Sequence, residues 1–400
     1  MAKRIRAKIK PEIISWARKS AGFTEDAAAK KINVKPERLL AWESEEDDLY
    51  PTISQLRNMA RVYKRPLAVF YLQEEPLGFQ VMRDFRRLPG TGLRFYSPEL
   101  TLEIRSAQQR RELALELFQD IDSLPEEFDL SASTDEDPEA VGERIRRTLG
   151  VAHDLQRKWR DPRVGFNTWR EKIEAVGVLV FQMPSVERDE VSGIAFHEAL
   201  LPVIAINKND AFSRRAFGLL HEFTHLLIGE PGVSDYGVDE RRPPEDQMIE
   251  VFCNSVASAA LMPQTHFLNE PIAAAPHGAE DWSDDEIGEL ATVFSVSREA
   301  VARRLLTFGL TTNRFYQQKR AQYRQEYLDW LERERKRLKE SKQEFFTNPP
   351  RDTVNAMGKP FVRVVLNNYY QDRLTLSDVS RYLGLRVKHM TRLEQFVGFG

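Results

Sequence analysis

The sequence predicts a mainly α-helical protein with a small β-sheet, an α+β fold. Three features lead to this prediction. The first seventy-odd residues contain five short helical patterns, the middle of the chain holds three short apolar runs typical of strands, and the chain from Glu245 onward is helical almost to its end. A length of 400 residues allows two or three domains, each with a core of its own.

The composition is that of an ordinary soluble protein, with 42% apolar and 30% charged residues. No apolar run approaches the ~20 residues that span a bilayer, so we expect no membrane partner. The N-terminal stretch MAKRIRAKIK is basic, but no apolar segment follows it, which argues against a secretory signal. The single cysteine, Cys253, excludes an internal disulfide framework and predicts a cytoplasmic location.

Charge is distributed unevenly along the chain. Residues 1–72 carry fifteen Lys/Arg and nine Asp/Glu, a balance of +6. Because the whole chain has a formal charge of −3, the remaining residues carry −9. A small basic region on an acidic body makes nucleic acid a plausible partner of the N-terminal region alone.

The N-terminal region has the pattern of a helix-turn-helix domain, which we place at residues 1–75. Thr24 is a favourable N-cap for its second helix, and Pro36 occupies the first turn of its third. The short connection Ile-Asn-Val separates these two helices, as a helix-turn-helix requires. The expected helices cover residues 11–22, 25–31, 36–44, 52–60 and 66–72.

Residues 9–72 resemble the XRE (Cro/C1-type) helix-turn-helix family. The resemblance rests on WARKSAGFTEDAAAKKINV, on AWES and on PTISQLRNMARVYKRPLAVFYL. It implies that the helix from Lys35 to Ser44 is the recognition helix, with a DNA operator as partner and a homodimer on two half-sites. Lys35 and Arg38 in its exposed first half are the expected DNA-binding residues, with Lys30 and Lys31 just before them.

Five acidic residues follow this helix closely, in the stretch Glu43–Asp48. Phosphates would be repelled there, and the same acids would attract a basic protein. A purely protein-binding role for the N-terminal domain therefore remains open beside DNA binding.

A connector and a small sheet are expected next. A long amphipathic helix should run from Pro98 to Ile121, and the acidic stretch Leu124–Glu139, with two prolines, is the best linker in the chain. Residues 76–139 are therefore expected to form a helical connector and an acidic linker. Helices at Val141–Leu149 and near Thr168–Val176 precede the strand-like runs 177–183, 192–197 and 201–207.

The stretch GLLHEFTHLLIGEPG contains the pattern His-Glu-x-x-His in an apolar helix that Gly229 ends. His221 and His225 lie one turn apart on one helix face, so both can bind one Zn²⁺. Glu222 is rotated about a quarter turn away, where it can act as general base on a metal-bound water. The alternative is a buried helix with two histidines by accident, but only about 0.01 chance matches are expected at this composition.

A catalytic zinc site needs a third protein ligand. Glu250 lies inside the next helix, whose apolar residues show that it packs into the core, and a buried carboxylate there needs a partner. Zinc or a salt bridge would supply that partner. Glu245 and Asp246 have a sufficient role at the positive end of that helix. Loop residues Asp235, Asp239 and Glu240 are weaker candidates, because loops place ligands poorly.

The stretch from about residue 140 to residue 270 resembles the ImmA/IrrE metallopeptidase family. The resemblance rests on HEFTHLL, on EVFCNSVASAALMP and on PVIAINKNDAFSRRAFGLLHE. It implies a zincin-like peptidase domain, placed at 140–275, with His221, His225 and Glu250 as Zn²⁺ ligands and Glu222 as general base. Cys253, Val256 and Ala260 depart from the family's usual residues by small apolar changes that leave the ligands intact.

Three further residues near the site have competing interpretations. Cys253 is a small core residue or a redox-active or metal-binding thiolate. His197, at a strand end, is a surface histidine or a donor that lines the cleft. Tyr236 in the loop is a weaker candidate for the same donor role.

The helical C-terminal region is expected at residues 276–400. Its long charged helix, from the stretch TTNRFYQQKRAQYRQEYLDWLERERKRLKESK, alternates in charge, which favours packing or oligomer formation over DNA binding. The stretch DRLTLSDVSRYLGLRVKHMTRLEQF predicts a further helical pair.

Two functions from different classes follow. The first is a zinc-dependent endopeptidase joined to a DNA-binding domain, a regulator that cleaves a repressor or other regulatory protein, as the ImmA/IrrE resemblance implies. The second is an antitoxin, whose body binds a partner toxin and whose N-terminal domain represses their shared promoter. In that case the metal would be structural or sensory.

Overall fold

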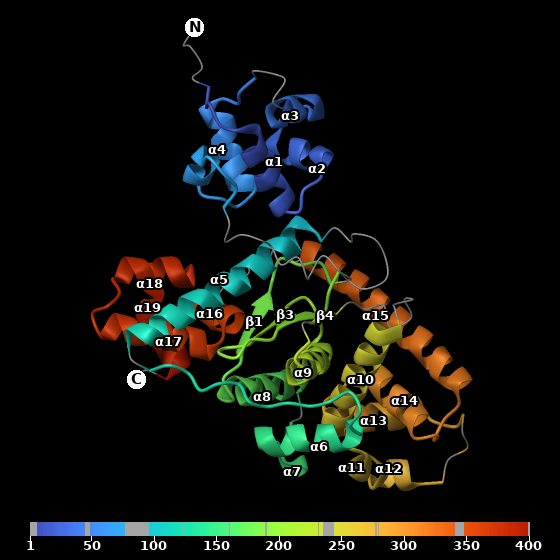
Figure 1. Cartoon of the computed structure of the whole chain (residues 1–400). Helices are drawn as coiled ribbons and strands as arrows, with labels where there is room; N and C mark the ends of the chain where they lie inside the picture. The colour runs from blue at the N-terminus through green and yellow to red at the C-terminus, as the bar shows by residue number, and fades with distance from the viewer. Residues whose placement is uncertain are drawn as a thin grey trace. The chain divides into compact units, whose positions relative to one another are not determined.

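A computed structural model describes residues 6–44, 49–76, 96–121, 123–159, 161–188, 190–230, 232–234, 244–276, 278, 280–340 and 348–398. The chain divides into two compact units, Met1–Gln109 and Arg110–Gly400, and the boundary falls inside helix α5, Pro98–Asp120. The described residues are mainly helical with one small mixed sheet, which confirms the predicted fold class (Figure 1). No helix among them is long and apolar enough to cross a membrane.

Unit 1 begins with five short helical elements. Their positions agree with the prediction, except that the fifth is a 3₁₀ helix, which runs from Leu67 to Tyr71. Thr24 caps the second helix through Ala27 N–H, and Asn33 ends it in the left-handed conformation (φ 60°). The elements are α1 Pro11–Ser20, α2 Glu25–Ile32, α3 Pro36–Glu43, α4 Ile53–Val62 and η1 Leu67–Tyr71.

Unit 2 is built around a four-stranded sheet. Its strands are β1 Leu179–Met183, β2 Gly193–Phe196, β3 Val203–Asn207 and β4 Gly232–Ser234, in the order β1-β3-β2-β4. β1 and β3 are parallel, and the other two pairings are antiparallel. The first three strands are buried along their whole length, which explains their uninterrupted apolar sequences. The fourth strand was not predicted.

Helices cover both faces of the sheet. α9, Phe212–Leu227, packs against β2, β3 and β4, while α8, Pro162–Ala175, packs against α9 and β1 (Figure 1). On the other face, Phe361 packs edge-on against Phe181 of β1. The further helices are α6 Pro138–Leu149, α7 His153–Gln156, α10 Pro244–Leu261, α11 Gln264–Leu268, α12 Pro271–Ala274, α13 Asp284–Phe294, α14 Arg298–Thr307, α15 Asn313–Glu340, α16 Pro349–Met357, α17 Lys359–Tyr370, α18 Leu376–Leu383, η4 Val387–His389 and α19 Met390–Val397.

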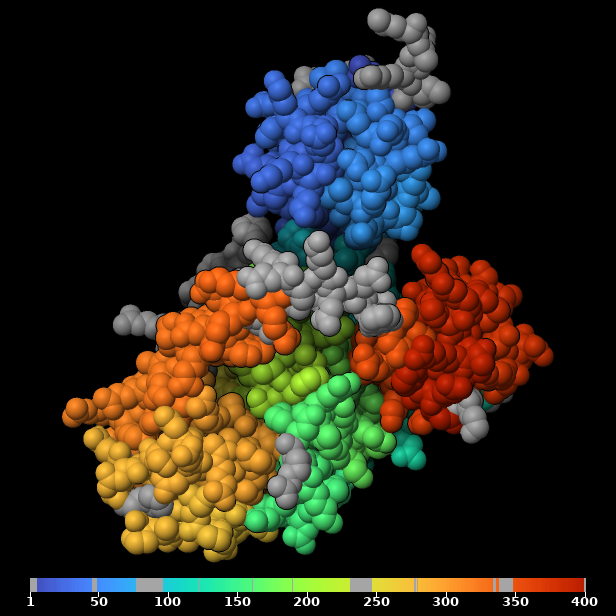
Figure 2. Space-filling model, turned by 180° about the vertical axis from the view of Figure 1, so that it is seen from behind, coloured from blue at the N-terminus to red at the C-terminus, as the bar shows by residue number. Residues whose placement is uncertain are grey.

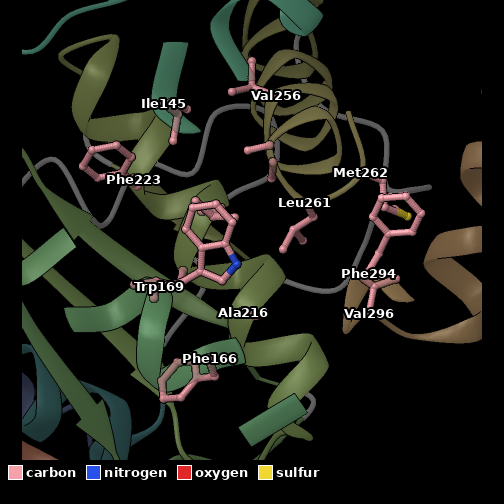
Figure 3. Close-up of a cluster of buried hydrophobic side chains, with 14 of the residues drawn as sticks. Ile145, Phe166, Trp169, Ala216, Phe223, Val256, Leu261, Met262, Phe294 and Val296 are labelled. Atoms are coloured by element: carbon pink, nitrogen blue, oxygen red, sulfur yellow. The ribbon is translucent and has the colours of Figure 1, made fainter. Parts of the chain in front are cut away.

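A continuous apolar core joins α6, α8, α9, α10, α13 and α14. Figure 3 shows part of it, with Trp169 of α8 near its centre and Phe223 of α9 and Val256 of α10 on neighbouring elements. This core holds α9 and α10 together, and both carry residues of the predicted metal site.

The acidic stretch that we expected as a linker lies along unit 2. Phe128 N–H donates to Ala199 C=O, and Ala132 N–H donates to Leu227 C=O, both at 2.8 Å. The Phe128 ring also contacts Phe223 edge-on. Most acidic residues of this stretch are exposed, whereas Glu136 and Glu139 are half-buried and Phe128 anchors the stretch to the core, so composition alone did not indicate its packing.

The position of α10 depends on a close approach to α6. A Cβ placed on Gly142 would lie 2.7 Å from Ala259 Cβ and 2.8 Å from Ala260 N. Both distances are shorter than van der Waals contact. The glycine therefore allows the two helices to pack as closely as they do.

We expect Gly142→Ala to lower the free energy of unfolding by about 1–3 kcal/mol, because α10 must shift to accept the methyl group. Gly288→Ala on α13 is the matched control, since a Cβ there meets nothing within 4 Å. This control should gain about 0.5–1 kcal/mol from its higher helix propensity. Urea denaturation of both variants measures the difference, and equal stability would contradict the close-packing explanation.

Candidate metal centre

Helix α9 carries three of the predicted site residues in the core of unit 2. Its residues from Gly218 to Leu227 are all buried, and Gly229 follows in the left-handed conformation, as expected for a helix end. Asn207 at the end of β3 shapes the connection into α9. Its amide donates to the carbonyls of Glu187 and Val191, and its Oδ1 accepts from Asn209 N–H.

The structure brings His221, His225 and Glu250 together. The two Nε2 atoms lie 3.2 Å apart. Glu250 reaches them from α10, with Oε2 at 3.5 Å from His221 Nε2 and Oε1 at 3.5 Å from His225 Nε2. In the described part of the chain this is the one group of three or more His, Cys, Asp or Glu whose ligand atoms lie close enough to hold a metal ion.

The spacing of these atoms suits a tetrahedral Zn²⁺ ion. Two ligands at ~2.0–2.1 Å from a tetrahedral ion are separated by about 3.3 Å. The three distances bracket that value, and the donors are the imidazole nitrogens and carboxylate oxygen that zinc accepts. The residues therefore fit a zinc ion held by three protein ligands.

Asn254 orients one of these histidines. Its Oδ1 lies 3.0 Å from His221 Nδ1, so the Nδ1–H group donates to the amide and leaves Nε2 for a metal. Sequence reasoning did not single out Asn254. It stands four residues after Glu250 on the same helix, so the i, i+4 rule could have placed it on the same face.

The electrostatics of the site favour a cation. Burial lowers the pKa of His225, but hydrogen bonding with Cys253 and Glu250 and the nearby charge of Glu222 raise that pKa to a net value well above the ordinary one. A positive charge is therefore stabilised at this point. A proton supplies it on the imidazole, or a divalent ion supplies it between the ligands.

Glu222 lies beside the ligands and is held against strand β2. Its side chain is completely buried. A Cβ placed on Gly193 would lie 2.7 Å from Glu222 Cγ and 2.8 Å from its Oε1. The carboxylate thus occupies the space that any other residue at 193 would fill, and sequence reasoning did not indicate this role for Gly193.

Cys253 is completely buried next to His225, and burial raises the pKa of its thiol. This environment fits the interpretation as a small core residue, because a raised pKa keeps the thiol neutral. His197 is exposed and its Nδ1 bonds with Leu226 C=O at 3.0 Å, at the C-terminal end of α9. This bond fits the surface interpretation.

Several weaker candidates lie outside what the structure describes. Asp235, Tyr236, Asp239 and Glu240 fall outside the described residues. Glu245 and Asp246 are in the first turn of α10, but their side chains are not among the described ones.

A cleft of about 550 Å³ opens beside the metal ligands. Its walls come from α9, α10, α14 and α15, together with the start of α6. His221 and Glu250 lie in this wall, as do Phe217, Asn254, Arg303 and Tyr316. The site is therefore reachable from a cavity large enough for a drug-sized ligand or a short peptide segment.

The two predicted DNA-binding residues lie in unit 1. Lys35 is the N-cap of α3, and Arg38 follows in its first turn, 5.8 Å from the Trp42 ring; both are exposed. The predicted acidic patch needs one correction, because Glu43 is buried in a two-bond pair with Arg18 of α1 at 2.8 Å. Glu43 therefore stabilises the fold, while residues 45–48 lie outside the described residues.

Comparison with known proteins supports the class of the central domain. Residues 173–306 match the family model Peptidase_M78, described as an IrrE N-terminal-like domain. The matched segment contains His221, Glu222, His225 and Glu250. This part of the chain is thus similar to an IrrE N-terminal-like domain.

A solved structure and the curated proteins add less. A Mycobacterium tuberculosis transcriptional regulator aligns at 17% identity with a TM-score of 0.29, over 49% of this chain and 51% of that one. The alignment thus spans about half of that regulator, and a TM-score this low supports no conclusion about fold or function. The comparison with curated proteins gives no match.

We expect Asn254→Ala to weaken zinc binding by about 10–100-fold, because His221 loses the partner that fixes its tautomer and ring orientation. Competition with a fluorescent zinc chelator measures the affinity. Ser255→Ala is the control, since its hydroxyl only donates to Val251 C=O of the same helix. Equal affinities for the two variants would show that Asn254 does not support the site.

Proposed function

We propose that unit 2 is a zinc-dependent endopeptidase and that unit 1 binds DNA, which makes the chain a transcriptional regulator that cleaves a regulatory protein. One observation carries the proposal. Two imidazole nitrogens and a carboxylate lie 3.2–3.5 Å apart beside a buried glutamate and an open cleft. The match to a peptidase family over the same residues supports the reaction class.

Each side chain has one task in this mechanism. His221, His225 and Glu250 hold the ion, and Asn254 keeps His221 Nε2 directed at it. Zinc, when bound, polarises the peptide carbonyl and lowers the pKa of water. Glu222 takes a proton from the attacking water and passes it to the leaving amine.

The burial of Glu222 helps it to do this. Burial and close contact with Gly193 keep this carboxylate in one position beside the metal ligands. The cleft borders His221 and Glu250 and is large enough for a segment of chain, which is the reason for proposing an endopeptidase.

The role of unit 1 is proposed from its charge and its exposed cations. We assign Lys35 and Arg38 to DNA contacts at the start of α3, in a domain of the XRE type that acts as a homodimer. The removal of Glu43 from the surface makes this face less acidic than its sequence indicates. A regulatory protein bound to the same DNA would then be the substrate.

An antitoxin is the second candidate. The observation that favours it is the exposed apolar surface on α15, where Leu328 and Trp330 are about half exposed. Such residues suit a protein partner, a toxin in this case, and binding it would need no turnover. Loss of a catalytic residue separates the two functions.

We expect Glu222→Gln to keep one zinc per chain and to lower the cleavage rate by about 10²–10⁴-fold, because the amide cannot accept the proton. Metal content by mass spectrometry and cleavage of candidate DNA-bound proteins measure the two effects. If this variant holds zinc and cleaves as fast as the wild type, the peptidase assignment is wrong. If neither the wild type nor this variant cleaves any candidate, but both bind a partner with equal affinity, the result supports the antitoxin function.

Gly193→Ala tests how the general base is positioned while Glu222 itself is kept. The new methyl group would overlap the Glu222 side chain, so we expect cleavage to fall at least about tenfold while zinc affinity stays unchanged. Gly218→Ala on α9 is the matched control, because its Cβ meets only Ile206 Cδ1 at 3.9 Å. Equal rates for both variants would show that β2 does not position Glu222.

A further inference from the structure

The C-terminal helices α18 and α19 repeat the plan of α2 and α3. Thr375 caps an eight-residue helix, as Thr24 does, and each helix ends in a left-handed residue nine positions after its cap. That residue is Asn33 in unit 1 and Gly384 at the C-terminal end. In both cases the next helical element begins three residues later.

The buried positions of the two pairs coincide as well. They lie five and one residues before the left-handed residue and six and nine residues after it. These four positions are where two helices joined by a tight turn pack against each other. The matching pairs are Ala28 with Val379, Ile32 with Leu383, Leu39 with Met390, and Trp42 with Leu393.

The second helical segment of the C-terminal pair carries three exposed cations. Arg386 immediately precedes η4, Lys388 lies in η4 and Arg392 lies in α19; the exposed Thr391 and Gln395 follow Lys388 and Arg392 by three residues each. The opposite face of α19 packs on α16 and α17. Figure 2 shows these helices, coloured red, gathered in one lobe.

The three cations are available to a ligand. Within the described residues none of them takes part in an ion pair. The nearby acids are engaged, Asp378 with Thr375 and Arg381 and Glu394 with the Tyr370 hydroxyl. Residues 348–400 carry eight Lys/Arg and four Asp/Glu, a balance of +4, whereas residues 73–347 carry −13.

The pair α13 and α14 shows that the plan alone does not make such a face. Ser295 is its left-handed residue, but α15 covers α14. Arg303 of α14 is exposed in the wall of the cleft, near the Tyr316 ring, and the other two cations of α14 are used within the fold. Arg304 bonds with Met262 C=O and pairs with Glu139, and Arg298 pairs with Glu326 of α15. Among the described residues of unit 2, the C-terminal pair therefore differs from α13 and α14 in carrying three exposed cations that form no ion pair.

We propose that Arg386, Lys388 and Arg392 form a second DNA-binding face, specific for duplex DNA, at the C-terminal end of the chain. The cations meet phosphates on both sides of the major groove, and Thr391 and Gln395 offer hydroxyl and amide groups to base edges. A chain with two such faces contacts two separate DNA segments. This binding does not depend on zinc or on peptidase activity.

The test uses the full-length protein and a fluorescent 40-bp duplex of mixed sequence, with anisotropy measured at ~50–200 mM salt. The triple variant Arg386→Ala, Lys388→Ala, Arg392→Ala is compared with Arg147→Ala, Lys158→Ala, Arg314→Ala, which removes three exposed cations elsewhere in unit 2. Both sets are made in a Lys35→Ala, Arg38→Ala background, so that unit 1 contributes little.

We expect the C-terminal triple variant to bind about 10–100-fold more weakly and to lose about two to three from the slope of log K against log salt, at roughly 0.9 per phosphate contact. The control set should stay within about twofold. Arg386→Lys with Arg392→Lys keeps the charges and should restore the slope, and an unchanged melting temperature excludes unfolding. Equal affinity and slope for the triple variant and the control set would overturn the proposal.

Discussion

The approach of α10 to α9 is the contact on which the rest of unit 2 depends. It places the Glu250 carboxylate 3.5 Å from two imidazole nitrogens inside an apolar core, where bare charges are costly. Gly142 makes the approach possible beneath α10, and Gly193 leaves room for Glu222 beside α9. A cluster of donors assembled in this way is stable when a cation lies among them. The same packing that forms the core therefore forms a metal site.

Three helix pairs of one plan serve different purposes in this chain, because different elements cover their second helices. α15 covers α14, whose Arg304 is buried against Met262 and Glu139 and whose surface forms part of the cleft wall. Lys35 and Arg38 at the start of α3 are exposed, as are Arg386, Lys388 and Arg392 at the C-terminal end. The helix-turn-helix pattern in a sequence thus predicts a shape, and tertiary packing decides whether that shape has a free face.

Most elements followed from local patterns. The strands β1, β2 and β3 lie within the three apolar runs, and α5 spans the amphipathic stretch that predicted it. β4 was missed because its three residues, Gly232–Ser234, sit in a stretch rich in Gly, Pro and charge, and pairing with β2 makes it a strand. The segment near Phe128 was expected as a linker, because its exposed acids outnumber the one ring that anchors it.

The sequence by itself determined the spacing of His221, Glu222 and His225, because the geometry of one helical turn places the histidines on one face and the glutamate beside them. It also indicated Glu250, through a carboxylate on a helix that had to be buried. Only the tertiary structure decided the distances among the ligands, the bond from Asn254 to His221, and the use of Glu43 by Arg18. These contacts join residues on different elements, and local periodicity does not encode how closely two elements pack.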